Sequence, residues 1–400
     1  MISQHENEKS KTQYEDILKR NSKEKNLSKN NLDSSRYGTD YIVHWNDVPL
    51  TVSNIFLMSL DDKKKVAQYL FNYFREGGFP YPKYPDEDLK KDWDKLKKYE
   101  VSSLIQDDII SCGATTGNKI FKHFSPQFYD VKESGSKSRS PIEVFDNDIL
   151  LMKVIENRLG ITFYYRGVSH PFTITGNMFR QGIRSMRLAP QTSNFRPTVA
   201  KLIYEKYAPE NGKIFDYSSG FNQRLLGAMA FSKNLTYVGV DPWGTTIDQG
   251  NKLIKHFGFE DRAKLHNMGS EDFCPEDLIE SFDLAFSSPP YHEKEKYTDE
   301  ASQAYSKGYE SFLNDYWTRT VQNVGRLLKP SGRFVLNISD KHKELEIKKD
   351  MVSIIESNGF HLSETLFMKF SKSHLSKKVG TENLTKLEPI LVFEKTLLGE

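Results

Sequence analysis

Residues 213–241 read KIFDYSSGFNQRLLGAMAFSKNLTYVGVD, and this stretch decides the fold. Two short apolar runs, residues 213–217 and 235–241, flank a stretch with helical patterning that begins near Asn222. A strand, a helix and a second strand in this order predict a crossover unit of a parallel sheet. Further apolar runs follow at residues 263–268, 283–287, 333–339, 363–370 and 389–395. Helical stretches separate the first five runs, whereas only a loop separates the last two, which predicts a terminal hairpin.

The composition is that of a globular protein with about two domains. The chain has 400 residues, of which 37% are hydrophobic and 28% charged, so it can bury a sizeable core. Its formal net charge of +2 excludes a global polycation and leaves nucleic-acid contacts to local basic patches. The N-terminal residues lack the apolar core of a signal peptide, and no window approaches the roughly 18 apolar residues of a membrane span. We therefore expect a cytoplasmic protein in which Cys112 and Cys274 are reduced thiols and form no metal site.

Three regions of the chain differ in their patterning. Residues 1–40 are rich in Lys, Asn, Ser and Glu, which predicts a disordered or flexible tail. Residues 41–175 are expected to form a mostly helical N-terminal module, with one helix that ends at Gly77-Gly78 and another that ends at Gly160. This module is a candidate for target recognition. Residues 176–400 are predicted to form the α/β domain.

A distinctive motif follows the strand predicted at residues 283–287. The tetrapeptide Ser288-Pro289-Pro290-Tyr291 begins at the carboxyl end of that strand, where open parallel sheets bind their ligands. Consecutive prolines cannot extend a central strand, but they hold the backbone rigid and leave its carbonyl groups free. Ser288 Oγ and the Pro289 carbonyl could accept hydrogen bonds from an exocyclic amino group, and Tyr291 could stack on a flipped base. The alternative is a structural turn without chemistry.

Residues at the ends of the first three strands suit a nucleoside ligand. Small residues after the first strand, Ser218 and Gly220 among them, allow the backbone to approach a ligand closely. Asp241 ends the second strand, where an acidic side chain can bind both ribose hydroxyls of an adenosine. Ser270 and Glu271 follow the third strand, where the adenine ring would lie. For Asp241, an ordinary turn or helix cap is the alternative.

Together these residues resemble the amino-methyltransferase family of DNA methyltransferases, over roughly residues 176–395. FDYSSGF is similar to the family's Asp-Pro-Phe-x-Gly-x-Gly loop at Asp216 and Gly220, with Tyr217 at the proline position and Asn222 at the last glycine. The resemblance implies a Rossmann-like class I sheet of seven strands and S-adenosyl-L-methionine (SAM) as cofactor.

The same resemblance assigns roles to further residues. Asp241 matches the acid that binds the ribose, and Asp216, Ser218 and Gly220 belong to the cofactor loop. Arg196-Pro197 opens a helix similar to the one that lines the methionine end of SAM in the family.

The tetrapeptide has the form most associated with cytosine-N4 enzymes, whereas adenine-N6 enzymes more often begin it with Asp or Asn. The resemblance therefore implies methylation of DNA, cytosine N4 before adenine N6, as in restriction-modification systems. An RNA base methyltransferase, for example one acting on guanine N2, is an alternative, because such enzymes use a similar tetrapeptide. A catalytically inactive SAM-fold protein that binds nucleic acid is another. A cytosine-C5 enzyme needs a Pro-Cys nucleophile, whereas Cys274-Pro275 has the reverse order.

Two basic stretches are candidates for contact with nucleic-acid phosphates. Arg180, Arg184 and Arg187 share one face if MFRQGIRSMR is helical. Lys372, Lys377 and Lys378 lie in the loop between the last two predicted strands. Solvent-facing side chains without a ligand are the alternative in both places.

Overall fold

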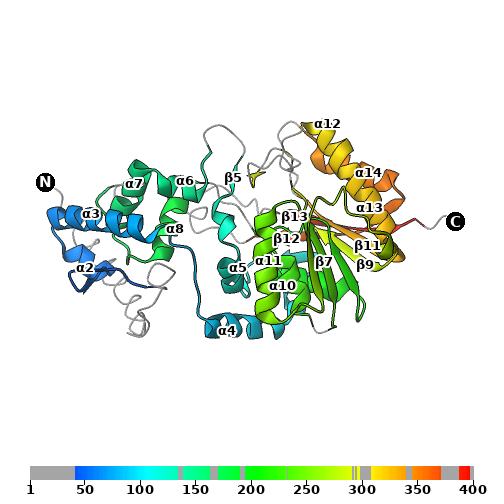
Figure 1. The fold of residues 1–400 in the computed structure, drawn as a ribbon, viewed down its shortest axis with the longest axis horizontal. Coiled ribbons are helices and arrows are strands. Elements are labelled where there is room, and N and C mark those ends of the chain that lie inside the picture. The colour runs from blue at the N-terminus through cyan, green and yellow to red at the C-terminus, as the bar shows by residue number, and fades with distance from the viewer. Residues whose placement is uncertain are drawn as a thin grey trace. The chain divides into compact units, whose positions relative to one another are not determined.

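The computed structural model describes residues 41–133, 138–162, 170–189, 194–231, 233–290, 292, 295–297, 308–338, 345–370 and 387–396. The chain divides into two compact units (Figure 1). Met1–Lys83 and Val144–Leu188 form what we call the helical unit, and Tyr84–Glu143 and Ala189–Glu400 form the sheet unit. The sequence suggested a division at residue 176. In the structure, residues 84–143 belong with the sheet instead. The tail at residues 1–40 lies outside the described residues.

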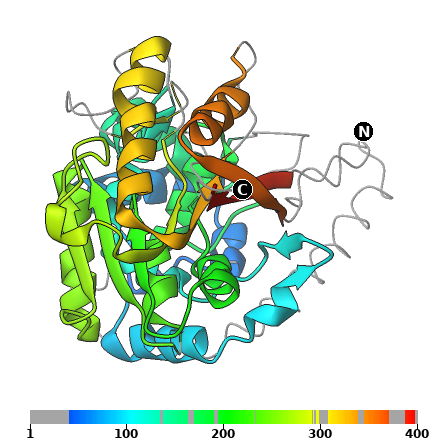
Figure 2. The ribbon, with the colours of Figure 1, turned by 90° about the vertical axis from the view of Figure 1, so that its right-hand side faces the viewer.

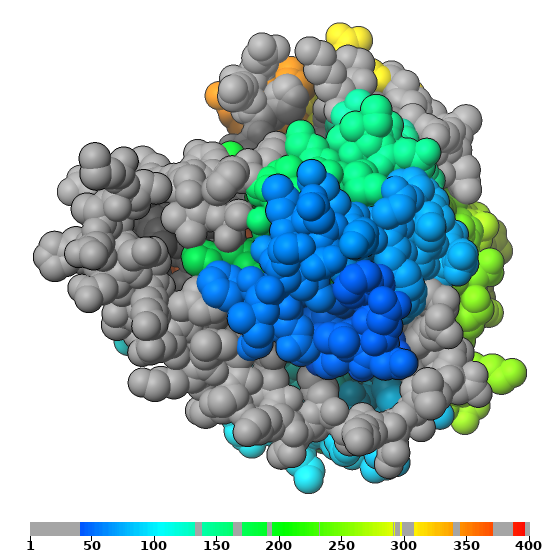
Figure 3. Space-filling view, turned by 90° about the vertical axis from the view of Figure 1, so that its left-hand side faces the viewer, coloured from blue at the N-terminus to red at the C-terminus, as the bar shows by residue number. Residues whose placement is uncertain are grey.

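The helical unit is built around one long amphipathic helix. Its elements are β1 (His44–Trp45), β2 (Val48–Pro49), α2 (Val52–Leu57), α3 (Leu60–Gly77), α7 (Asp148–Arg158) and α8 (Gly176–Ser185). Ser59 caps α3 by accepting from the amide of Asp62 at 3.1 Å, and Gly78 ends the helix with a φ of 73°. Val66, Leu70 and Phe74 are buried on one face, which confirms the predicted helix. Figure 3 shows the surface of this unit, blue over its N-terminal residues.

The sheet unit contains all seven predicted strands. They are β6 (Lys213–Asp216), β7 (Thr236–Asp241), β8 (Ala263–Asn267), β9 (Phe282–Ser287), β11 (Leu328–Asn337), β12 (Phe360–Lys369) and β13 (Leu387–Lys395). β13 lies between β11 and β12 and is antiparallel to both, which confirms the terminal hairpin. Numbered by chain order, the seven strands lie in the order 3-2-1-4-5-7-6. The predicted Rossmann-like class I methyltransferase sheet is thus confirmed.

Helices cover both faces of this sheet. On one face α9 (Pro197–Tyr207), α10 (Gln223–Met229) and α11 (Gly244–Phe257) pack on a core that includes Ile214, Tyr237 and Phe286. On the other face a π-helical segment (Phe312–Thr318), α13 (Arg319–Leu327) and α14 (Ile347–Ser357) pack on Phe215, Phe334 and Phe393. Figure 1 shows α10 and α11 on one side of β7 and α13 and α14 on the other. In the described part of the chain, no helix has the length and apolarity that crossing a membrane requires.

Residues 84–143 extend the sheet instead of forming part of a separate module. They contain α4 (Asp86–Lys97), a 3₁₀ turn (Val101–Leu104), β3 (Ile105–Gln106), β4 (Ile109–Ser111), α5 (Asn118–Phe124), a second 3₁₀ turn (Pro126–Tyr129) and β5 (Lys132–Glu133). β4 pairs in parallel with β12 and, with β3, brings the sheet to nine strands among the described residues (Figure 2, cyan strands). β5 pairs with β10 (Glu295–Lys296), which follows the tetrapeptide. The first of these pairings completes the edge of the sheet, and the second holds the chain beyond the tetrapeptide.

Side-chain contacts hold this segment to α9. Asp92 of α4 accepts the amides of Gly117 at 3.0 Å and Lys119 at 2.9 Å, which caps the start of α5. The buried Lys201 of α9 donates to three carbonyls at the end of α4, those of Leu96, Lys97 and Tyr99. A cation at a helix C-terminus is favoured by the helix dipole, so Lys201 stabilises the join between α4 and α9.

Candidate functional site

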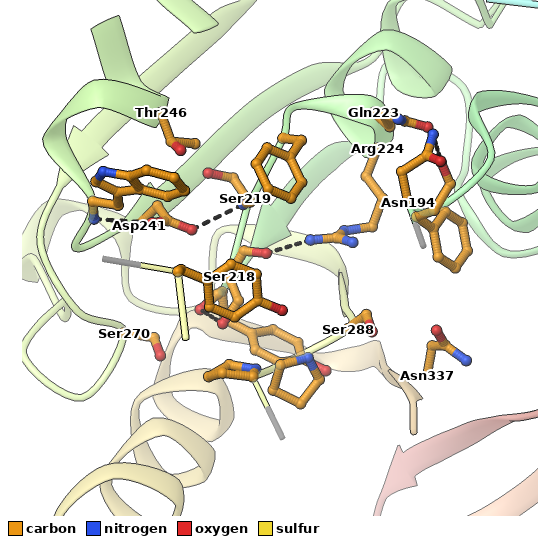
Figure 4. Close-up of a pocket in the computed structure, with 18 of the residues that line it drawn as sticks. Asn194, Ser218, Ser219, Gln223, Arg224, Asp241, Thr246, Ser270, Ser288 and Asn337 are labelled. Carbon is orange, nitrogen blue, oxygen red and sulfur yellow. Dashed lines mark hydrogen bonds between the residues drawn. The ribbon is translucent and has the colours of Figure 1, made fainter. Parts of the chain in front are cut away.

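A pocket lies at the carboxyl ends of the central strands of the sheet unit (Figure 4). The strand order reverses between β6 and β9, and open α/β sheets bind ligands at such a reversal. Of the residues predicted from the sequence, the lining includes Arg196, Ser218, Gly220, Asp241, Ser270, Glu271, Ser288, Pro289 and Pro290. The structure thus brings the cofactor and tetrapeptide candidates into one pocket. Tyr291 lies outside the described residues, and Pro197 is the buried first residue of α9, outside the lining.

The turn after β6 has the geometry of a loop that approaches a ligand closely. Gly220 has a φ of 53°, and Asn222 has a φ of 62°. Asn is one of the few residues besides Gly that adopt this left-handed conformation readily, so it can stand at the family's last glycine position. Its Nδ2 also donates to the carbonyl of Thr246 at 3.1 Å, which holds the turn against α11. Asn222 thus supplies a left-handed backbone conformation that glycine adopts most readily.

Asp241 lies at the end of β7 and joins the two loops that flank it. Its Oδ2 accepts the Gly220 amide at 2.9 Å, and its Oδ1 accepts the Trp243 amide at 3.0 Å. Burial raises the pKa of Asp241 to about 6, although these two amides favour the ionised form. A carboxylate has about four acceptor sites, so capacity remains for the hydroxyl groups of a ligand in the pocket.

The side chain of Asp216, which the sequence placed in the cofactor site, is held by groups of the protein. It is fully buried and is not part of the pocket lining. Its carboxylate accepts from Tyr237 Oη at 2.5 Å and from Ser287 Oγ at 2.8 Å. It also receives the Arg224 guanidinium, at 2.8 Å through Nε and 3.2 Å through Nη2. The acceptor sites of Asp216 are thus filled by the protein, and its side chain supports the loop.

Arg224 connects the cofactor loop to the strand that carries the tetrapeptide. Besides Asp216, it donates to the carbonyl of Ser218 and, at 3.1 Å, to Ser287 Oγ. Burial opposes the charged guanidinium, but the Asp216 carboxylate outweighs it and raises the pKa of Arg224. A buried ion pair of this kind is costly to break, because one charge would remain unpaired. The pair thus fixes the turn after β6 against the end of β9.

Some buried polar atoms of the pocket lack a hydrogen-bond partner among the described residues. Ser219 Oγ has no hydrogen bond, and neither amide atom of Gln223 has one. Both side chains line the pocket, where Gln223 is 3% exposed and Ser219 is 1% exposed. Unpaired buried polar atoms are costly, so atoms of this kind in a pocket indicate a polar ligand. Gln223 offers both a donor and an acceptor, which fits a zwitterionic amino-acid group.

The tetrapeptide begins immediately after β9. β9 pairs in parallel with β11, and Leu336 lies opposite Ser287. The next residues in this register are Ser288 and Asn337. Ser288, Pro289 and Pro290 face the same pocket as Asp241. This matches the placement expected for a tetrapeptide at the carboxyl edge of the sheet.

Several lining residues were not predicted from the sequence. They are Asn194, Phe195, Gln223, Tyr316, Asn337, Met368, Glu388 and Cys112, among others. Asn337 ends β11 as Asp241 ends β7, but the sequence predicted that strand to continue to residue 339, so the position of Asn337 at the strand end was not foreseen. Cys112 follows β4, Met368 lies on β12 and Glu388 lies on β13, and only the strand pairing brings them together. Burial raises the pKa of the Cys112 thiol to about 12, so it is not a nucleophile near neutral pH.

The predicted phosphate contacts are only partly described by the structure. Arg184 is exposed on α8, and Arg180 on the same helix donates to the carbonyl of Pro80. Arg187 is also exposed but follows the end of α8 with a φ of 55°, so the three arginines do not share a helical face. The lysines at 372, 377 and 378 lie outside the described residues.

No family model and no curated protein matches the chain. Among solved structures, it is similar to a TehB-like SAM-dependent methyltransferase from Corynebacterium glutamicum, with 15% identity, 55% of this chain and 96% of that chain covered, and a TM-score of 0.33. TrmN from Thermus thermophilus has 14% identity, with 50% of this chain and 48% of that chain covered and a TM-score of 0.32. A SAM-dependent O-methyltransferase from Thermotoga maritima has 15% identity, with 55% of this chain and 71% of that chain covered and a TM-score of 0.36. Similarities at this level concern the fold alone.

Proposed function

We propose that the sheet unit is a SAM-dependent methyltransferase that acts on an exocyclic amino group of a nucleic-acid base. Cytosine N4 in DNA is the preferred target, ahead of adenine N6. The observation that carries the proposal is that one pocket contains both Asp241 and Ser288-Pro289-Pro290. A nucleoside-binding acid and a group of rigid acceptors within one pocket suit a reaction that joins a nucleoside cofactor to an amine.

The pocket residues fit the three parts of SAM. Asp241 retains acceptor sites for the ribose hydroxyls, and Ser270 and Glu271 line the end where the adenine ring would lie. Ser219 and Gln223 have polar atoms without a partner in the described part of the chain, and these atoms suit the ammonium and carboxylate groups of the methionine end. When bound, SAM supplies an electrophilic methyl group on a positively charged sulfur.

The residues of the tetrapeptide then have a defined task. The lone pair of an exocyclic amino nitrogen is delocalised into the ring, which makes the nitrogen a poor nucleophile. Ser288 Oγ and the Pro289 carbonyl accept its N–H groups and favour the tetrahedral geometry in which the lone pair is localised. The methylated nitrogen is cationic and acidic, so it loses its proton readily and no strong base is required. Positioning of this kind can account for several kcal/mol of barrier lowering.

For DNA as the partner, the exposed Arg184 of the helical unit is a candidate contact with phosphate. We propose that this unit takes part in target recognition, because the residues between the cofactor loop and the tetrapeptide are sheet elements and helices of the core fold. The lysines at 372, 377 and 378 are likewise candidate contacts with phosphate.

Mass spectrometry of nucleosides tests the proposal. DNA and RNA from cells that express the chain are digested and compared with those from cells that express the Ser288→Ala variant. We expect N4-methylcytosine in DNA from the parental chain only. A methylated guanine in RNA would instead favour an RNA base methyltransferase. No methylated nucleoside, together with SAM binding in calorimetry, would indicate an inactive SAM-fold protein, and 5-methylcytosine would refute the amino-group mechanism.

A further inference from the structure

Asn337 is the residue next to the tetrapeptide that no motif assigns. It is the last residue of β11 and stands beside Ser288 at the carboxyl edge of the sheet. The side chain lines the pocket and is 3% exposed. Figure 4 shows Asn337 on the same side of the pocket as Ser288, across from Asp241 and Ser270. Its position is therefore that of a residue on the substrate side of the site.

The orientation of the Asn337 amide is fixed by one hydrogen bond. Its Nδ2 donates to the carbonyl of Pro389 on β13 at 3.1 Å. This bond places the amide nitrogen on the β13 side and leaves Oδ1 at the other end of the amide. None of the described residues donates a hydrogen bond to Oδ1, so the pocket contains a carbonyl oxygen that is held in position and can accept from a ligand. An anchored amide of this kind can only accept at its free end.

We propose that Asn337 Oδ1 accepts a hydrogen bond from the amino group of the target base and is a catalytic residue of this site. The inference rests on the proposed function. Ser288 has a hydroxyl that can donate as well as accept, so it alone does not define the direction of the hydrogen bond. Asn337 Oδ1 is an amide oxygen, which can accept a hydrogen bond but cannot donate one. As the nitrogen becomes positively charged during methylation, a fixed carbonyl dipole stabilises it without reorganisation.

This arrangement also selects the chemical class of the target. A primary amino group presents two N–H donors, and Ser288, Asn337 and the Pro289 carbonyl offer acceptors for them. A keto oxygen at the same ring position would face the Asn337 oxygen with no proton between them, and two acceptors in contact repel. The site thus favours cytosine over uracil, or adenine over hypoxanthine, through the amino group itself.

Two substitutions separate this role from a purely structural one. Asn337→Leu and Asn337→Asp both lose the Nδ2 donor that anchors β13, but only ionised Asp retains an acceptor near Ser288. We expect Asn337→Leu to lose roughly 10- to 100-fold in kcat with unchanged SAM affinity. Asn337→Asp should keep at least several-fold more activity than Asn337→Leu. Each variant is measured by single-turnover methyl transfer to DNA, with SAM affinity from calorimetry and folding from thermal unfolding.

A matched control is Asn358→Leu, because Asn358 Nδ2 donates to the carbonyl of Ile354 at 2.7 Å and lies outside the pocket lining. It should methylate at the parental rate. Equal rates for the Leu and Asp variants at position 337 would overturn the inference while the parental chain remains active. An inactive parental chain would overturn the proposed function and the inference with it. If Asn337→Leu does not fold, an Asp variant that is folded and as inactive as Ser288→Ala would likewise overturn it.

Discussion

Acidification should weaken the binding of SAM through one carboxylate. The pKa of Asp241 is raised to about 6 by burial, so the group is ionised at pH 7.5 and mostly protonated at pH 5. Ribose hydroxyls donate to the ionised form, and protonation removes acceptor sites that the Gly220 and Trp243 amides leave available. Affinity is therefore present above about pH 6 and is lost as the pH falls through this value. At one pH unit below the pKa, the affinity for SAM should be about tenfold lower, which corresponds to about 1.4 kcal/mol of binding free energy.

Calorimetric titration of SAM between pH 5 and pH 8 measures this effect. The α-amino group of SAM also titrates, so the Asp241→Asn variant serves as the matched control and the ratio of the two affinities is the quantity of interest. At pH 7.5 the variant should bind about 1–3 kcal/mol more weakly than the parental chain. At pH 5 the two affinities should approach each other to within a few-fold. A ratio that stays constant across this range would refute the assignment of Asp241 to the ribose.

The remaining predictions concern the network, the tetrapeptide and the helical unit. Arg224→Met leaves the Asp216 carboxylate buried without its ion-pair partner, and thermal or urea unfolding should show a loss of about 3–5 kcal/mol, whereas a loss below 1 kcal/mol would contradict this role. Ser288→Ala removes one acceptor and should lower kcat roughly 10- to 100-fold at unchanged SAM affinity; a parental rate would make the tetrapeptide a structural turn. Arg184→Glu should weaken DNA binding in fluorescence anisotropy to a similar extent for all sequences, and it should reduce the slope of log affinity against log salt concentration by about one. Unchanged binding would exclude a phosphate contact.

A truncation that removes residues 1–170 does not isolate the catalytic part of this chain. Residues 84–143 belong to the sheet unit, where β4 pairs with β12 and the carbonyls that end α4 bind Lys201. Deleting them would expose the β12 edge and leave a buried lysine without acceptors. Recognition by the helical unit is therefore better tested by surface substitutions such as Arg184→Glu than by deletion.

Local patterns in the sequence determined the seven strands and the place of the site. Runs of apolar residues separated by helical stretches specify a parallel sheet, because each strand must bury both faces. A proline pair after an apolar run marks the end of a strand, and Asp241 is found at a strand end by the same reasoning. Each of these signals is contained in a short run of neighbouring residues, so no knowledge of distant contacts was needed.

Only the tertiary structure decided which groups surround Asp216 and Asn337 and to which unit residues 84–143 belong. Asp216 differs from Asp241 because Arg224, Tyr237 and Ser287 converge on it, and these partners come from three separate elements. β4 has three residues, too few for a periodic signal, and is stabilised by pairing with a strand more than 250 residues later. The Asn337 amide is oriented by Pro389 on another strand. Burial and hydrogen-bond direction are properties of the assembled sheet, so residues of the same type acquire different chemistry according to which distant side chains meet them.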